Sequence, residues 1–162
     1  MGRKGKGGAL MVKAFNPDIS LGADVYYNVP GVAVVKWDPT LKAAHIEWQG
    51  WADTTEYAAA NDAIIGALSD RHGSRALGDC RLLKVIKQSD QDWSVRDWFP
   101  RVLAAGLRRM ALVIPTSGLA GMNVKDILSQ VPGTKLEIAH FSTIEEARAW
   151  LAQPLTIPPV GQ

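Results

Sequence analysis

One short segment places an acid, a thiol and a guanidinium next to one another, as Asp79, Cys80 and Arg81. A nearby guanidinium lowers the pKa of a thiol and so favours the thiolate, the nucleophilic form. This segment raises the hypothesis of a small enzyme that uses Cys80 and Asp79. The alternative is a buried cysteine beside an Asp–Arg pair, and we favour it because a nucleophilic cysteine usually needs a positioned histidine.

The three histidines lie far apart in the sequence, and none is near Cys80. No His-x-x-x-His or Cys-x-x-Cys spacing occurs, so the sequence offers no local set of metal ligands. We therefore predict no metal, no cofactor and no catalytic residue. His140 ends a predicted strand and is kept as a candidate for a crevice, although an edge histidine with ordinary partners is commoner. His72 is expected at a helix C-terminus, where a cation offsets the helix dipole.

A second polar segment, Pro115, Thr116 and Ser117, follows an apolar run and leads into a glycine-containing stretch. Glycines and hydroxyls before a helix favour an anion at its N-terminus. The segment lacks the Gly-x-x-x-x-Gly-Lys-Ser/Thr pattern of a phosphate loop, so an ordinary strand-to-helix connection is the preferred interpretation. In an open α/β sheet ligands bind beyond the carboxyl ends of the strands, and both polar segments are predicted there.

The chain contains six tryptophans, a large number for its length. Trp51 follows a glycine and Trp93 lies in a polar segment, so both are candidates for exposure. Exposed aromatic side chains often anchor interfaces, and these two are predicted to mark a surface for a partner or a ligand.

The elements that would position these residues begin with three strands, expected over 24–29, 32–37 and 43–48. Pro30 and Gly31 form the turn of a hairpin between the first two. A helix then starts at Asp53, which forms a capping box with Glu56, and Gly73 is expected to end it in the left-handed conformation.

The second half of the chain alternates strands with helices. Strands are predicted over 76–80, 109–114 and 136–141, the middle one buried on both faces. A helix within 91–107 is expected to begin at Ser94 with Asp97 as its capping partner, and Pro100 would either bend this helix or start it. Another helix carries an apolar stripe from Val124 to Val131. The last is capped by Ser142 or Thr143 together with Glu145 or Glu146.

This order, βββαβαβαβα, predicts a single α/β domain with a mixed sheet, opened by antiparallel strands and continued by right-handed βα crossovers. The length of 162 residues leaves room for one domain, and 47% apolar residues suffice for a core. We place a flexible basic tail at 1–18, the domain at 19–152 and a proline-rich tail at 153–162.

Charge is unevenly distributed along the chain. The net charge is +2, but Arg3, Lys4, Lys6 and Lys13 are the only charged residues among the first fourteen, so the remainder carries −2. Because no aromatic residue interleaves with these four cations, a solvated tail is preferred to a nucleic-acid-binding arm. No apolar run has the length of a signal peptide core or of a membrane span, so neither export nor integral membrane association is predicted. A single cysteine fits a reducing compartment, and we predict a cytoplasmic protein.

The segments 93–115 and 141–151 resemble bacterial SpoIIAA-like proteins of the STAS-like group, above all in Gly106-Leu-Arg-Arg-Met-Ala and Glu145-Glu-Ala-x-x-Trp-Leu. The resemblance covers about residues 24–151 and implies the α/β fold described above. Members of the wider group include anti-sigma-factor antagonists, which are switched by a phosphoserine, and domains likened to lipid-carrying CRAL-TRIO modules. The antagonists' Asp-Ser-Ser-Gly-like run is missing, because no serine follows Asp79 and the next ones, Ser89 and Ser94, are displaced.

The resemblance and the missing catalytic constellation together predict a non-catalytic module that binds a regulatory protein partner or a small apolar, lipid-like ligand beyond the carboxyl ends of the strands. The enzyme using Cys80 and Asp79 remains the alternative. The exposed edge strand of the opening hairpin also makes a homodimer, paired across a two-fold axis, an expectation from this pattern.

Overall fold

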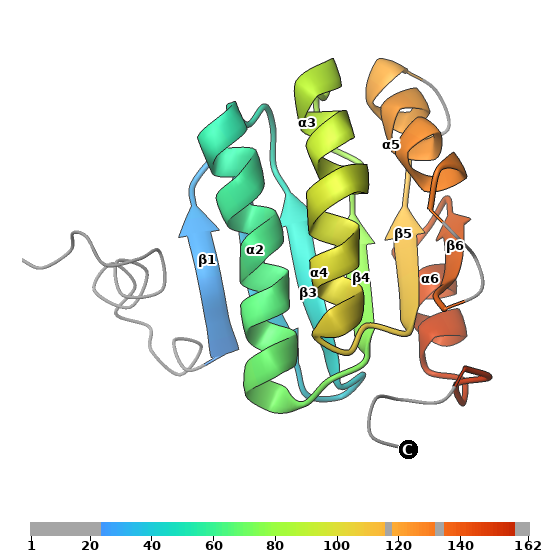
Figure 1. The fold of residues 1–162 in the computed structure, drawn as a ribbon. Helices are drawn as coiled ribbons and strands as arrows, with labels where there is room; N and C mark the ends of the chain where they lie inside the picture. Colours follow the sequence, from blue (N-terminus) through green and yellow to red (C-terminus); the bar gives the residue numbers. More distant parts are fainter. Residues whose placement is uncertain (1–23, 116–117, 132–134, 158–162) are drawn as a thin grey trace, which may run out of the picture.

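The structure is a computed structural model that describes residues 24–115, 118–131 and 135–157 as one mixed sheet with helices on both faces (Figure 1). The elements follow the predicted order. They are β1 (Val25–Val29), β2 (Ala33–Asp38), β3 (Ala43–Trp48), α2 (Thr54–Arg71), β4 (Arg75–Asp79), α3 (Gln88–Trp93), the π-helix η2 (Ser94–Trp98), α4 (Phe99–Ala104), β5 (Arg109–Val113), α5 (Leu119–Ser129), β6 (Glu137–Phe141) and α6 (Ile144–Leu151).

The six strands lie in the sheet in chain order, from β1 to β6. The pairs β1–β2 and β2–β3 are antiparallel, as predicted, and the remaining three pairs are parallel. β5 is buried along its whole length and pairs on both sides, one strand in from the edge strand β6. The carboxyl ends of β3, β4, β5 and β6 therefore meet at one end of the sheet.

The helices form two layers of unequal size. The connections through α2, through α3–η2–α4 and through α5 each join neighbouring parallel strands, so the right-handed crossover rule sends all three to the same face (Figure 1). The larger core lies beneath them. α6 follows the last strand and covers β4–β6 on the other face, over a smaller core around Leu77, Ala111 and Leu151.

Helix α2 begins at its predicted cap. Asp53 accepts a hydrogen bond from the Glu56 N–H at 2.8 Å, and the Glu56 carboxylate accepts one from the Asp53 N–H at 3.0 Å. The predicted end is wrong by one residue, because His72 and not Gly73 takes the left-handed conformation, with φ of 52°. Gly73 is needed for packing instead, since a Cβ there would lie 2.7 Å from the Trp37 ring.

The second helical connection is continuous from Gln88 to Ala104, with the π-turn η2 in its middle. Its predicted start at Ser94 is wrong. Ser94 is buried inside the helix, where its hydroxyl donates to the Asp90 carbonyl and shares a hydrogen bond of 2.8 Å with the Tyr57 hydroxyl. Asp97 pairs with Arg101 rather than forming a cap. Pro100 neither starts the helix nor interrupts it, because the wider π-turn just before it accommodates a residue that lacks an N–H.

The remaining helices follow their predicted stripes. α5 buries Val124 and Ile127 against the sheet. The cap of α6 is Thr143, whose hydroxyl accepts from the Glu146 N–H at 3.2 Å. Within the described ranges, no helix is both long enough and apolar enough to cross a membrane.

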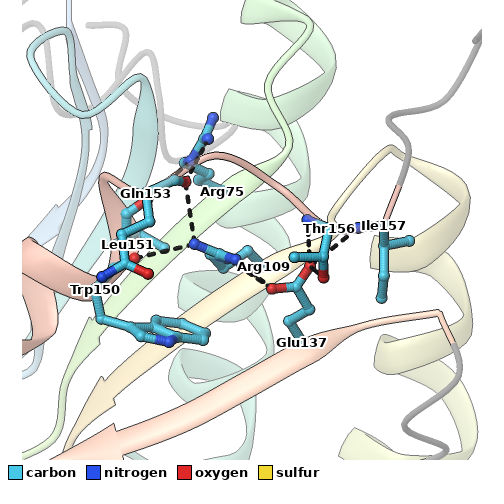
Figure 2. A network of polar contacts seen from close by, with 8 residues as sticks. All are labelled: Arg75, Arg109, Glu137, Trp150, Leu151, Gln153, Thr156 and Ile157. Carbon is cyan, nitrogen blue, oxygen red and sulfur yellow. Dashed lines mark hydrogen bonds and ion pairs between the residues drawn. The ribbon is translucent and has the colours of Figure 1, made fainter.

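The amino ends of the parallel strands are joined to the end of α6 by a polar cluster (Figure 2). The Arg109 side chain is 4% exposed, pairs with Glu137, and donates to the carbonyl oxygens of Trp150 and Gln153 at 3.1 and 3.0 Å. The other carboxylate oxygen of Glu137 accepts from the Thr156 N–H at 2.9 Å and from its hydroxyl at 2.5 Å. We call this cluster the clasp. It holds the chain beyond Ala152 against the sheet as far as Ile157.

Candidate binding site at the carboxyl end of the sheet

Asp79 ends β4 on the side of the sheet that α6 covers. Its carboxylate accepts three hydrogen bonds from Arg81, one from the backbone N–H at 3.1 Å and two from the guanidinium at 2.9 and 2.6 Å. Burial alone would raise the pKa of Asp79, but these bonds and the charge of Arg81 hold it below its ordinary value. Asp79 and Arg81 therefore neutralise each other as a closed ion pair.

Cys80 points to the opposite side of the sheet, into the larger core, and is 4% exposed. Burial, and secondarily the charge of Asp79, raises the pKa of its thiol to about 12. The Arg81 guanidinium is already bound to Asp79, so the thiolate that an enzyme would need is not formed at neutral pH. The hypothesis of an enzyme that uses Cys80 and Asp79 therefore has no thiolate to serve as the nucleophile.

The other candidates are spread over the molecule. Trp51 is 49% exposed in the β3–α2 loop, whereas Trp93 is half-buried, with its ring edge-on to Tyr57 at 6.1 Å. His140 is exposed on β6, where it lines an open groove beside α5 with Leu128, at a distance of two strands from β4. Pro115 is half-buried after β5. Thr116 and Ser117 lie outside the described residues.

A different set of side chains gathers at the carboxyl end. The large apolar side chains that are exposed in the described part of the chain all lie in the connections that follow β3, β4 and β5. We call them the apolar strip: Trp51, Leu82, Val85, Leu119 and Met122, with exposed fractions of 49 to 62%.

Direct contacts hold the three connections of the apolar strip together. The ammonium of Lys87 lies 5.9 Å from the centre of the Trp51 ring, which joins the second connection to the first. The Ile86 N–H donates to the Asn123 side-chain oxygen at 2.9 Å, which joins the second connection to α5. Large apolar side chains gathered at one end of a fold differ from the single, scattered exposed residues that are usual on protein surfaces.

The segment 80–87 has two apolar sides. Leu82 and Val85 face solvent, whereas Leu83 and Ile86, each next to one of them in sequence, are buried. The segment carries Arg81, Lys84 and Lys87 and no carboxylate. Arg81 is paired with Asp79, but neither lysine lies within ion-pair distance of a carboxylate of the described residues. The apolar strip is therefore accompanied by two uncompensated positive charges.

Beneath this segment a cavity of about 70 Å³ lies between the sheet and the larger helical layer. Leu83 and Ile86 line it from above, and Cys80 is part of its wall. Within the described residues no group of three histidine, cysteine or carboxylate side chains is placed to hold a metal ion.

Sequence reasoning singled out Trp51 but missed the other four members of the apolar strip. One signal was present, since Leu82-Leu83-Lys84-Val85-Ile86 is an apolar run outside any predicted element. Such a run is either covered by the fold or exposed on its surface. Here Leu83 and Ile86 are covered, whereas Leu82 and Val85 are exposed.

Taken together, these features define a single α/β domain that exposes apolar side chains at the carboxyl end of its sheet, with no assembled catalytic group among the described residues. The model of the SpoIIAA-like family matches residues 43–152, and the chain belongs to this family. Its members are in general non-catalytic regulatory or binding modules. Searches of curated proteins and of solved structures returned no match.

Proposed function

We propose that this protein is a cytoplasmic, non-catalytic regulatory module that docks a protein partner on the apolar strip. The observation that carries the proposal is the concentration of exposed large apolar side chains in three successive connections at one end of the sheet. Interfaces are built around such apolar centres, with a polar rim that selects the partner.

The charge of the surface specifies the chemistry of the partner. Lys84 and Lys87 flank Val85 and lack carboxylate partners, so a complementary surface presents apolar side chains flanked by aspartate or glutamate. A short acidic amphipathic helix meets both requirements, because its apolar side chains recur on one face.

The test starts from cross-linking in the source cells, followed by reconstitution with the purified partner that this identifies. The double substitution Leu82→Ser/Val85→Ser removes two exposed apolar side chains, and its effect on folding stability is expected within about 0.5 kcal/mol. We expect this variant to bind the partner at least about tenfold more weakly. Reversing the charges with Lys84→Glu/Lys87→Glu is expected to weaken binding mainly at low ionic strength.

Lys36→Glu is the matched control, because Lys36 is an exposed lysine on β2, outside the connections that carry the strip. Binding that survives Leu82→Ser/Val85→Ser but is lost in Lys36→Glu would contradict the proposal. Sedimentation analysis of the protein alone examines the other occupant, a second copy of the chain; self-association abolished by Leu82→Ser/Val85→Ser would overturn docking of a different protein.

A further inference from the structure

The two edge strands of the sheet differ in how regular they are. β1 and β6 lie at the edges, and neither has a second partner strand among the described residues. The register of β1 against β2 shifts between Val25 and Tyr27, whereas β6 pairs with β5 without a shift. Bulges, lysine and proline are features that keep an edge strand from pairing, and β6 contains none of them. The β6 edge, rather than the edge of the opening hairpin, is therefore the one suited to adding a strand.

The hydrogen bonds of β6 show which of its backbone groups point to the free edge. The Glu137 N–H donates to the Arg108 carbonyl at 2.9 Å, and the Phe141 carbonyl accepts from the chain just after β5 at 3.0 Å. Along a strand the N–H and C=O groups of successive residues point alternately to the two sides. The first, third and fifth residues of β6 therefore bond to β5. The second and fourth, Ile138 and His140, direct their N–H and C=O groups to the free edge.

β6 is also more open to solvent than its neighbour. Every residue of β5 is buried, whereas no residue of β6 is. Beside β6 lies an open groove, lined by Leu128 and Val131 from the end of α5 and the turn after it, and by Ile138 and His140 from the strand. The three apolar side chains among these four are half-buried. The β6 edge thus combines free backbone groups with partly exposed apolar surface.

We infer that the β6 edge pairs with the β6 edge of a second copy of this chain, antiparallel and across a two-fold axis at Ala139. Ala139 is the middle residue of the strand, so this register pairs all five residues. It places Ile138 of each copy opposite His140 of the partner subunit. The outward N–H and C=O groups then meet in four hydrogen bonds, two for each Ile–His pair.

The side chains of β6 are compatible with this register. Ala139 lies opposite its own copy at the axis, where the strands approach most closely and a methyl group is small enough to fit. Glu137, the one carboxylate of the strand, lies opposite Phe141 of the partner subunit and is already paired with Arg109 in the clasp. No like charges are therefore placed opposite each other.

The groove favours a second copy over a strand from another protein. A two-fold axis perpendicular to the sheet places the two α5 grooves side by side on the same face, so each half-buried apolar surface adjoins the other. A single foreign strand supplies the backbone hydrogen bonds but no second groove. The paired strands run in opposite directions, which leaves one apolar strip at each end of the joined sheet. The dimer therefore stands whether or not a protein docks on the strip.

Sedimentation of the full-length protein over a concentration series tests the inference. We expect a dimer that dissociates on dilution. His140→Pro removes an outward N–H that the sheet does not use, at an edge position where proline is tolerated, and should raise the dissociation constant of the dimer at least about tenfold. Leu82→Ser/Val85→Ser should leave the dimer intact.

Asn28→Pro is the matched control on the other edge. The Val29 carbonyl accepts from Val32 within the hairpin, so the backbone groups of the preceding residue, Asn28, point outward from β1. We expect this variant to change the dissociation constant by no more than about twofold. A monomer at every concentration, equal weakening by both proline variants, or a dimer lost only in Leu82→Ser/Val85→Ser would overturn the inference.

Cross-linking decides should His140→Pro fail to fold. Cys80 is buried, so a cysteine introduced on β6 is the thiol that an oxidant such as diamide reaches. In the register centred on Ala139 the two copies of Ala139→Cys have Cα atoms about 4.5 Å apart, within disulfide range. The two copies of His140→Cys, a more exposed position, lie diagonally at about 7 to 8 Å, beyond that range. We expect a disulfide-linked dimer from Ala139→Cys alone; linkage of His140→Cys alone, or of neither variant, would overturn the inference.

Discussion

At the scale of single residues, His45 is a buried group whose protonation affects the stability of the fold. It lies on β3, and its Nε2 atom is buried without a hydrogen-bond partner among the described residues. Burial, with a smaller contribution from the charge of Lys36, lowers the pKa of His45 to about 4. The folded protein therefore holds this histidine neutral at every pH where an exposed histidine would begin to gain a proton.

Because of this one side chain, the free energy of unfolding should decrease as the pH is lowered. Between pH 6.5 and 4, His45 is protonated in the unfolded chain but neutral in the folded chain. The contribution of His45 to the free energy of unfolding is therefore complete above pH 6.5 and is lost as the pH falls towards 4. From pH 7.5 to 5 the loss is about 2 kcal/mol. Urea unfolding at both pH values should show that His45→Gln removes this difference, and an unchanged pH dependence in the variant would refute the assignment.

Residues 79–81 show where sequence reasoning stops at this scale. Their adjacency raised the hypothesis of one reactive group, but successive side chains near the end of a strand point to opposite faces of the sheet. Asp79 and Arg81 consequently pair on one side, and Cys80 is buried on the other. The bland interpretation, a buried thiol beside an ion pair, is confirmed.

At the scale of the elements, alanine substitutions of two glycines, one within α2 and one just after it, should change the free energy of unfolding in opposite directions. Gly66 is exposed inside α2, and a Cβ there would meet nothing within 4 Å, so Gly66→Ala should raise the free energy of unfolding by about 0.5 to 1 kcal/mol. Gly73→Ala would place its Cβ 2.7 Å from the Trp37 ring and should lower that free energy by about 1 to 3 kcal/mol. Thermal unfolding of both variants checks the pair, and a stabilised Gly73→Ala would contradict the packing described for Trp37.

The elements themselves were largely predictable from the sequence. Capping boxes and apolar stripes depend on side chains a few positions apart, and these fixed the start of α2 at Asp53 and the class of every strand. The π-turn η2 was not predictable, because a single wide turn within a helix leaves no distinct periodicity in the sequence. The exposure of the apolar strip depends on which connections the sheet brings together, so it too required the three-dimensional fold.

At the scale of the whole molecule, the clasp predicts that the stable domain extends beyond Ala152. The predicted boundary at Ala152 leaves out Gln153 and Thr156, which the clasp uses. Burial alone would raise the pKa of Glu137, but Thr156 and Arg109 lower it to about 2. Its contribution to stability is thus present above its ordinary pKa and is lost as pH falls towards 2.

Truncation tests this boundary directly. A chain that ends at Ala152 lacks the Gln153 carbonyl oxygen, to which both Arg75 and Arg109 donate. Its free energy of unfolding should be lower by about 2 to 4 kcal/mol. A chain ending at Ile157 keeps every contact of the clasp and is the control. Urea unfolding of the two truncated chains at pH 7 compares them, and equal stability would show that the domain ends at Ala152.

The clasp cannot be complete until the chain has been synthesised as far as Ile157. The strands lie in the sheet in chain order, so the partner of each new strand has already been synthesised when that strand leaves the ribosome. Arg109 is released long before Glu137, Trp150 and Gln153, and until they emerge its positive charge has no acceptor in the clasp. A nascent chain halted after β5 therefore carries Arg109 without its clasp partners beside an unpaired strand edge, and such edges make incompletely folded chains prone to aggregation.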